Sequence, residues 1–113
     1  MESQLELFDD IVKNFDGLRQ ELPDVMGAQD TLRNEVYKEG ALSHKIKRLM
    51  ALAVALRAGC PGCILAQTKY AVEDGATKAE VLESVSVAAS MGGTTASAWS
   101  WMVVKLLKEL GKW

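Results

Sequence analysis

Apolar residues recur every three or four positions along most of the chain, and this spacing constrains the fold more than any other feature. It places apolar side chains along one face of an α-helix. Ser3 and Thr77 are each followed three residues later by glutamate, the capping-box pattern that begins a helix. Pro23 suits a first helical position, and Ser43 can cap a further helix. We therefore predict an all-α fold.

Glycines divide this pattern into about six helices. The predicted helices run from Ser3 to Gly17, from Pro23 to Gly40, from Ser43 to Gly59, from Cys60 to about Asp74, from Thr77 to the Gly92-Gly93 pair, and from that pair to about Leu110. No stretch alternates apolar and polar residues for long enough to predict a strand. The length of 113 residues, with no tandem repeat and no linker, indicates one domain over residues 1–113.

Composition argues against several classes of protein. Hydrophobic residues make up 49% and charged residues 25% of the chain, which is typical of a folded globular protein. The net charge of −2 argues against nucleic-acid binding, because nucleic-acid-binding domains usually carry a basic excess. The N-terminus lacks the basic start and apolar core of a signal peptide, and two cysteines do not make a secreted disulfide framework. We expect a cytoplasmic protein.

The segment Ser84–Val104 carries no charge over 21 residues, which is long enough to cross a bilayer. Seven of these residues are serine or threonine, and Gly92-Gly93 interrupts the middle. A pair of buried helices in close contact is therefore a better interpretation than a membrane span. A helix that faces water normally carries a charged stripe, and Trp99 and Trp101 project from different sides of one helix. We therefore expect this segment to contribute buried contacts to a homo-oligomer.

Cys60 and Cys63 have the clearest chemical potential. Residues three apart at a helix start have Cα atoms about 5 Å apart, inside the ~4.4–6.8 Å range in which a disulfide closes without strain. The free N–H groups of a helix start favour a thiolate there. Residues 41–69, which contain the pair, hold five basic side chains and no acidic one, and positive charge also favours a thiolate. The sequence therefore predicts a dithiol that closes and reopens.

Two other interpretations of the pair stay open: two structural cysteines, or half of a zinc site. Zinc needs four ligands, and the chain offers two cysteines and one histidine, His44, so only ligation shared between subunits would complete a site. We expect no metal and no cofactor. Trp99, Trp101 and Met102 could line a ligand pocket, although such residues at helical spacing more often belong to a core or an interface.

Residues 42–83, LSHKIKRLMALAVALRAGCPGCILAQTKYAVEDGATKAEVLE, resemble the carboxymuconolactone decarboxylase family and its AhpD-like (alkylhydroperoxidase D-like) branch. The likeness lies in the helix ending in Gly-Cys, the Cys-x-x-Cys pair and the later Gly-Ala-Thr, and it extends over about residues 20–110. It implies an AhpD-like helical bundle that assembles into homo-trimers or homo-hexamers. It also implies that the pair is a redox dithiol acting on peroxides, whereas the decarboxylases act on a lactone without this pair.

By the same resemblance, Cys63 matches the cysteine that attacks the peroxide, and Cys60 matches its disulfide partner. The family's proton relay uses a histidine four residues after the second cysteine and a glutamate twelve residues before the first. Gln67 and Arg48 occupy those positions here. Neither side chain can accept a proton from a thiol, so the usual activation of the nucleophile by a neighbouring base is missing. His44 is expected to face solvent near a helix start, at the far end from the cysteines.

The leading hypothesis is a thiol-dependent antioxidant or disulfide-exchange protein. It would reduce peroxides through Cys60 and Cys63, weakened by the loss of the relay and supplied with electrons by a dithiol donor. One alternative is a decarboxylase-like lyase on a small lactone acid, with Arg48 and Arg57 binding the carboxylate. Another is a non-catalytic oligomeric relative. No nucleic-acid or membrane partner is expected in any of the three.

Overall fold

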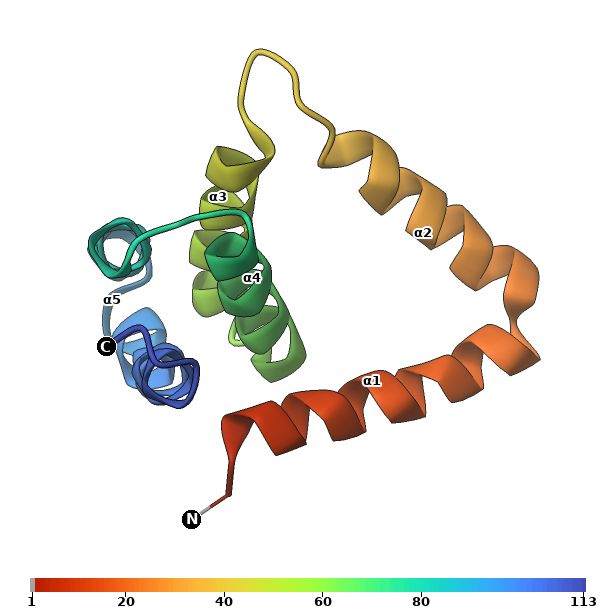
Figure 1. Cartoon of the computed structure of the whole chain (residues 1–113), viewed down its shortest axis with the longest axis horizontal. Coiled ribbons are helices and arrows are strands. Elements are labelled where there is room, and N and C mark those ends of the chain that lie inside the picture. Colours follow the sequence, from red (N-terminus) through yellow and green to blue (C-terminus); the bar gives the residue numbers. More distant parts are fainter. Residues whose placement is uncertain (1) are drawn as a thin grey trace.

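The computed structural model describes residues 2–113, which form five α-helices and no strand. The helices are α1 (Gln4–Glu21), α2 (Pro23–Val36), α3 (His44–Ala58), α4 (Pro61–Glu73) and α5 (Lys78–Glu109), as Figure 1 shows. The prediction of an all-α fold is confirmed.

Helix starts lie where the cap residues predicted them. Ser3, Ser43 and Thr77 are N-caps, and the side-chain oxygen of each accepts a hydrogen bond from the amide three residues later. The Glu80 side chain also accepts from the Thr77 amide, which completes a capping box at the start of α5. Each of these caps satisfies backbone N–H groups that have no partner within the helix.

Two helix ends differ from the prediction. α1 continues through Gly17 to Glu21, because a single glycine inside a helix costs only about 1 kcal/mol. It stops before Pro23, since the residue before a proline is disfavoured in the helical conformation. α2 ends at Val36 rather than at Gly40, and Tyr37 is its C-cap.

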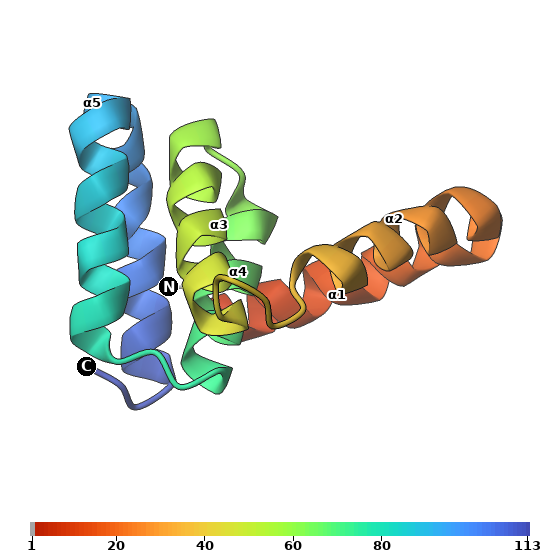
Figure 2. The same ribbon diagram turned by 90° about the horizontal axis from the view of Figure 1, so that it is seen from above.

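Helices α3, α4 and α5 pack together and hold most of the hydrophobic core (Figure 2). Their fully buried apolar side chains are Leu52, Leu56, Ile64, Leu65, Ala71, Val81, Val103, Leu106 and Leu107. Burying one such aliphatic side chain contributes about 1.5–3 kcal/mol. This packing fixes α4, whose first turn carries the cysteine pair.

Helix α5 is interrupted at Gly93, which has φ 59° and ψ −140°. Figure 2 shows the two halves of α5 running back along each other from this point. Residues 2–113 thus form five helices where six were expected, and the break lies at the predicted glycine pair. In the described part of the chain, none of the helices is both long enough and apolar enough to span a membrane.

Helices α1 and α2 form an arm, residues 4–36, that extends away from the core (Figure 2). Among residues 2–113, α2 packs against α1 and against no other helix. Nε of Arg19 lies 3.0 Å from a carboxylate oxygen of Asp30 and ties the two helices together. The hydrogen bond from Arg19 holds the pKa of Asp30 below its usual range. The arm is therefore joined to the core mainly through α1.

Glu109 fastens the start of α1 to the end of α5. Its carboxylate accepts hydrogen bonds from the hydroxyl of Ser3 and from the amides of Gln4 (2.8 Å) and Leu5 (3.3 Å). Burial of this carboxyl would raise the pKa of Glu109, but the three hydrogen bonds outweigh burial and hold the pKa below its ordinary value. Phe8, one turn further along α1, is buried in the core.

Candidate active site

The candidate site begins at the turn between α3 and α4. Gly59 ends α3 with φ 70°, and a Cβ at this position would lie 2.9 Å from Nε1 of Trp99. Both observations require glycine there. Cys60 is the N-cap of α4, and Pro61 takes an early helical position where an N–H has no helical partner. These three residues place the cysteine pair in the first turn of α4.

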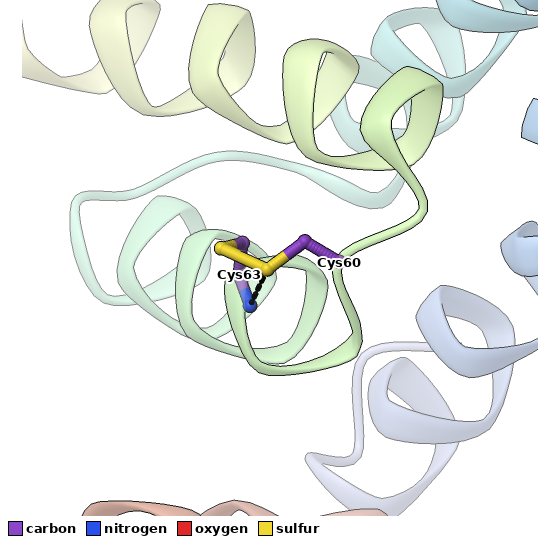
Figure 3. Close-up of a disulfide and its surroundings, with 2 residues drawn as sticks. All are labelled: Cys60 and Cys63. Atoms are coloured by element: carbon purple, nitrogen blue, oxygen red, sulfur yellow. Dashed lines mark hydrogen bonds between the residues drawn. A yellow bond between two sulfur atoms is a disulfide. The ribbon is translucent and has the colours of Figure 1, made fainter. Parts of the chain in front are cut away.

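Cys60 and Cys63 form a disulfide across this first turn (Figure 3). Their Cα atoms are 5.3 Å apart, as the spacing predicted. The amide N–H of Cys63 donates a hydrogen bond to Sγ of Cys60 at 3.3 Å, marked by the dashed line in Figure 3. The Cys60 sulfur is therefore the acceptor that caps α4.

The two sulfurs have different surroundings. Cys63 is exposed, whereas Cys60 is half-buried. The Cys60 sulfur lies at the positive end of α4 and accepts the amide N–H of Cys63, a position that favours a thiolate on Cys60 when the disulfide opens. A thiol that attacks the accessible sulfur of Cys63 thus displaces a stabilised thiolate, which leaves more readily. Cys63 is thus the more accessible sulfur, and Cys60 is the better placed leaving group when a thiol attacks the disulfide.

A cavity of about 880 Å³ opens beside the disulfide, within the size range of small-molecule sites. Residues from α1, from α2 and from the segment directly after α2 lie on one side. Residues from α3 and α4, together with the N-cap of α4, lie on the other. The lining includes the two cysteines, the residues at the relay positions, and apolar and aromatic side chains: Phe8, Ile11, Val12, Phe15, Tyr37, Arg48, Cys60, Cys63, Gln67 and Tyr70. Both cysteines and both relay positions therefore line one space.

The side chains at the two relay positions contact each other. Nη1 of Arg48 donates a hydrogen bond to Oε1 of Gln67 at 3.2 Å. Gln67 lies one helical turn after Cys63, on the same side of α4. Because the bond from Arg48 engages the amide oxygen, the NH₂ group is left as the free end of Gln67. The site therefore offers hydrogen-bond donors near the sulfur at the positions where a relay would hold a base.

Two tyrosines hold the Arg48 guanidinium, and neither could be recognised as a site residue from its position in the sequence. The guanidinium carbon lies 3.7 Å from the ring centroid of Tyr37 and 4.8 Å from that of Tyr70. These distances allow cation–π attraction to both rings. Tyr37 directly follows the arm and Tyr70 belongs to α4, so the residue after the arm and the core meet on this one side chain.

His44 lies outside the cavity but is connected to it. Its Nδ1 is 2.8 Å from a carboxylate oxygen of Asp74, and its Nε2 is 3.2 Å from one of Glu39. The same Asp74 oxygen lies 4.0 Å from Nε of Arg48. His44 is therefore away from the cysteines, as expected. Its ring is only 40% exposed and faces two carboxylates, which differs from a simple solvent-facing histidine.

The two other basic residues near the pair in sequence do not line the cavity. The Arg57 side chain lies against Gly92, where a Cβ would be 2.6 Å from its Cδ. Nζ of Lys69 lies 5.2 Å from the ring centroid of Phe8 and 3.9 Å from a carboxylate oxygen of Glu73. Among the basic residues of the segment 41–69, Arg48 is thus the one that reaches the space beside the cysteines.

A second, smaller cavity of about 350 Å³ is lined by Trp99, Trp101 and Met102, together with Gln4 and Pro61. Trp99 packs against the core, whereas Trp101 is 51% exposed. The two tryptophans therefore have different surroundings, as their positions on one helix predicted. Within residues 2–113, no group of three or more His, Cys, Asp or Glu side chains could hold a metal ion.

The sequence profile of the carboxymuconolactone decarboxylase family matches residues 23–105. Protein 4 of the cox locus of Paracoccus denitrificans, which is uncharacterized, is 37% identical over 79 residues, covering 70% of this chain and 71% of that protein. An uncharacterized protein of Cupriavidus necator is 31% identical over 84 residues, covering 74% of each chain.

Two crystal structures show the same fold. A carboxymuconolactone decarboxylase family protein of Legionella pneumophila, in its apo form, superposes with a TM-score of 0.92 at 30% identity, covering 99% of this chain and 100% of that chain. A family member from Thermotoga maritima, whose description suggests a part in the antioxidative response, gives a TM-score of 0.83 at 25% identity over 92% and 89% of the two chains. This chain belongs to the carboxymuconolactone decarboxylase family.

Proposed function

We propose that the protein is a thiol-dependent antioxidant or disulfide-exchange protein that reduces peroxides with the Cys60–Cys63 dithiol. The observation that carries this proposal is the disulfide at the start of α4, with Cys63 exposed on a cavity and the Cys60 sulfur held by an amide N–H. Family membership and the antioxidative description of the Thermotoga maritima relative support it. A cycling dithiol needs a reducing compartment, so we place the protein in the cytoplasm.

In the proposed reaction, the thiolate of Cys63 attacks the distal oxygen of a hydroperoxide, ROOH. The O–O bond breaks, Cys63 becomes a sulfenic acid and the alcohol ROH leaves. The Cys60 thiolate then attacks the sulfur of Cys63, which forms the disulfide and releases water. The two thiol protons end on ROH and on water. An external dithiol reduces the disulfide and is itself oxidised to a disulfide, so two electrons pass from it to the peroxide.

The residues at the relay positions support a slow version of this reaction. Gln67 can donate a hydrogen bond to a thiolate or a peroxide oxygen, and Arg48 adds positive charge nearby. Neither can take the proton from Cys63. Assistance by a general base contributes about 10²–10⁴-fold to such a step. We therefore expect lower peroxide turnover than in relatives that carry the histidine and the glutamate.

Peroxide consumption with dithiothreitol as the electron donor tests the proposal. Cys63→Ser should abolish turnover above background. In the absence of dithiothreitol, Cys60→Ser should react once with peroxide and stop as a sulfenic acid on Cys63, which mass spectrometry after dimedone labelling detects. Wild-type protein treated with mild peroxide should lose two hydrogens. If both cysteines of the oxidised protein can still be alkylated, the proposal is wrong.

The missing base gives a second test. Gln67→His places an imidazole one helical turn from Cys63 and should raise kcat/KM for a small hydroperoxide by about tenfold or more. Gln67→Leu is the matched control, because it also removes the amide but supplies no base. An equal rate in the two variants would show that proton transfer does not limit the reaction.

A lyase that acts on a small lactone acid is the second candidate, and the position of Arg48 in the cavity wall favours it. Arg57, which was expected to share the carboxylate, lies against Gly92 instead. Turnover of a lactone acid that persists in the Cys60→Ser/Cys63→Ser double variant would establish the lyase. Absence of both activities would leave a non-catalytic oligomeric role.

We also propose that the chain assembles as a homo-oligomer, a trimer or a hexamer. In the uncharged segment Ser84–Val104, Val87 is 57% exposed, Met91 83% and Trp101 51%. Further exposed apolar side chains follow one face of α3 (Ile46, Met50, Val54) and one face of α2 (Val25, Leu32, Val36). Exposed apolar side chains that share one face of a helix are typical of interfaces. Sedimentation equilibrium at low micromolar concentration should give a multiple of 12.3 kDa, and a stable monomer would overturn the proposal.

A further inference from the structure

The cavity beside the disulfide is lined by more positive than negative charge. Four cationic residues line it, Arg19, Arg33, Lys38 and Arg48, against one carboxylate, Asp30. Asp30 is already paired with Arg19, and Lys38 is paired with Glu35 outside the lining. Within residues 2–113, Arg33 forms no ion pair, and the nearest carboxylate oxygen to Arg48 is 4.0 Å away. Because Arg19 is also paired with Asp16, the weakly compensated positive charges of the lining are those of Arg33 and Arg48.

Arg48 is the fixed part of this charge. Its side chain is only 21% exposed, and its guanidinium lies between the rings of Tyr37 and Tyr70. Its Nε is buried and, among the described residues, has no hydrogen-bond partner. A buried cation is ordinarily paired with a carboxylate, and the planar guanidinium matches a carboxylate in shape. Arg48 is thus a fixed cation whose nearest carboxylate oxygen is 4.0 Å away, which leaves its guanidinium able to pair with a further carboxylate.

The side of the cavity formed by α1 is apolar. Phe8, Ile11, Val12 and Phe15 recur at helical spacing along the face of α1 that lines the cavity. A ligand that satisfied both sides would carry an apolar body and one anionic group. The carboxylate would lie close to the reacting sulfur, because Arg48 is bonded to Gln67 and Gln67 lies one turn from Cys63.

We propose that this cavity binds a carboxylic acid with an apolar chain and that Arg48 holds its carboxylate. The second part of this inference rests on the proposed function: the same acid also carries the hydroperoxide that is reduced at Cys63. Arg48 then determines specificity for carboxylated organic hydroperoxides. The carboxylate takes no part in the redox step. The hydroperoxide becomes an alcohol and water, and the dithiol becomes the disulfide.

The hydroperoxide of linoleic acid and its methyl ester test this specificity, since they share the reacting group and differ only in the charge. The wild-type kcat/KM should be about tenfold or more higher for the acid than for the ester. In Arg48→Met this ratio should fall to near one. Lys45→Met is the matched control: it removes a positive charge from the same helix but outside the cavity, and it should keep the wild-type ratio. A wild-type ratio near one overturns the proposal without any variant.

A binding measurement separates this inference from the peroxidase proposal. The Cys60→Ser/Cys63→Ser protein has no redox chemistry, and calorimetry with octanoate and octanamide probes the carboxylate alone. Octanoate should bind about tenfold or more tightly, and Arg48→Met in this background should remove the difference. Selective octanoate binding with no turnover of any hydroperoxide would support the acid site and overturn the peroxidase function. Turnover of acid and ester at equal rates, with equal binding of octanoate and octanamide, would do the reverse.

Discussion

The core formed by α3, α4 and α5 and the arm formed by α1 and α2 are both helical, but they are stabilised differently. In the core, Leu52 and Leu56 are 0% exposed. In α2, Val25 and Leu32 are each 62% exposed, and Met26 is the single buried side chain. The helices of the core are thus held by their own packing, whereas α2 has an apolar face that the rest of the described chain does not cover.

This difference bears on how the site works. A helix of 14 residues, the length of α2, is marginal in water unless one face packs against a neighbour. The cysteines belong to α4, which the core fixes, whereas Phe15 and Tyr37 belong to the arm or its end. The well-packed region therefore carries the proposed chemistry, and the weakly packed region supplies the wall that contacts the substrate. Assembly with a second copy would stabilise that wall.

The largest expected effect separates core packing from arm packing. Leu56→Ala should lower the free energy of unfolding by about 2–5 kcal/mol, because it opens a cavity among fully buried side chains. Leu32→Ala removes the same atoms from an exposed position and should cost less than about 0.5 kcal/mol in dilute protein. Urea unfolding at several protein concentrations measures both. If Leu32→Ala costs as much as Leu56→Ala at the lowest concentration, the arm is packed as firmly as the core.

Replacing a glycine by alanine should change the free energy of unfolding in opposite directions in the two regions. Gly93, at the reversal of α5, has φ 59°, so Gly93→Ala should lower the free energy of unfolding by about 1–3 kcal/mol through backbone strain. Gly27 lies inside α2, and a Cβ added there would meet no atom within 4 Å. Gly27→Ala should therefore raise the free energy of unfolding by about 0.5–1 kcal/mol. Thermal unfolding of both variants at one concentration decides the point. A neutral Gly93→Ala would show that φ does not determine this reversal.

The exposed face of α2 should matter for assembly. Leu32→Glu places a charge on that face, and we expect it to weaken self-association by about tenfold, or roughly 1.4 kcal/mol. Gln29→Glu adds the same charge to the same helix at a polar position and should leave association unchanged. Sedimentation velocity over a concentration series compares the two. Equal association of both variants and the wild type would place the interface elsewhere, on α3 or α5.

The fold was predictable wherever its signals are local. A cap such as Ser43 or Thr77 acts within three residues, and Gly59 acts through its own φ, so sequence spacing was enough to place the helix starts and the end of α3. The cysteine geometry was predictable for the same reason, since one helical turn fixes the Cα separation. The end of α2 at Val36 was not predicted, and the residue that follows it, Tyr37, contacts Arg48 of another helix, a tertiary contact that sequence spacing does not show.

Most of the surroundings of the cysteines could not be predicted, since they depend on tertiary contacts. Arg48 was recognised by position alone, and its stacking between Tyr37 and Tyr70 joins three segments that have no common pattern. The pairing of His44 with Asp74 likewise joins the start of α3 to the end of α4. A single sequence shows which side chains can stack or pair, but the packing of the arm on the core decides which ones do.

The smallest effect concerns the point where the arm is fastened to the core. Hydrogen bonds hold the pKa of Glu109 below its ordinary value in the folded protein. They therefore stabilise the folded state at pH values above the unfolded pKa of about 4.3, and this stabilisation is lost as the pH falls through the folded-state pKa. Glu109→Gln keeps the size of the side chain but removes its charge. At pH 7 it should lower the free energy of unfolding by about 1 kcal/mol at most, the cost of a weakened helix cap.

The pH dependence and the location of this effect distinguish it from a general loss of stability. The difference between wild type and Glu109→Gln should shrink as the pH is lowered below the folded-state pKa, where the wild-type carboxyl is also neutral. Hydrogen exchange should become faster in the first turns of α1, whose amides of Gln4 and Leu5 lose a charged acceptor, and stay unchanged in α4. Glu83→Gln, an exposed position on α5, is the matched control. If the Glu109→Gln difference is constant with pH, or exchange rises equally in α1 and α4, the charge of Glu109 does not hold the arm to the core.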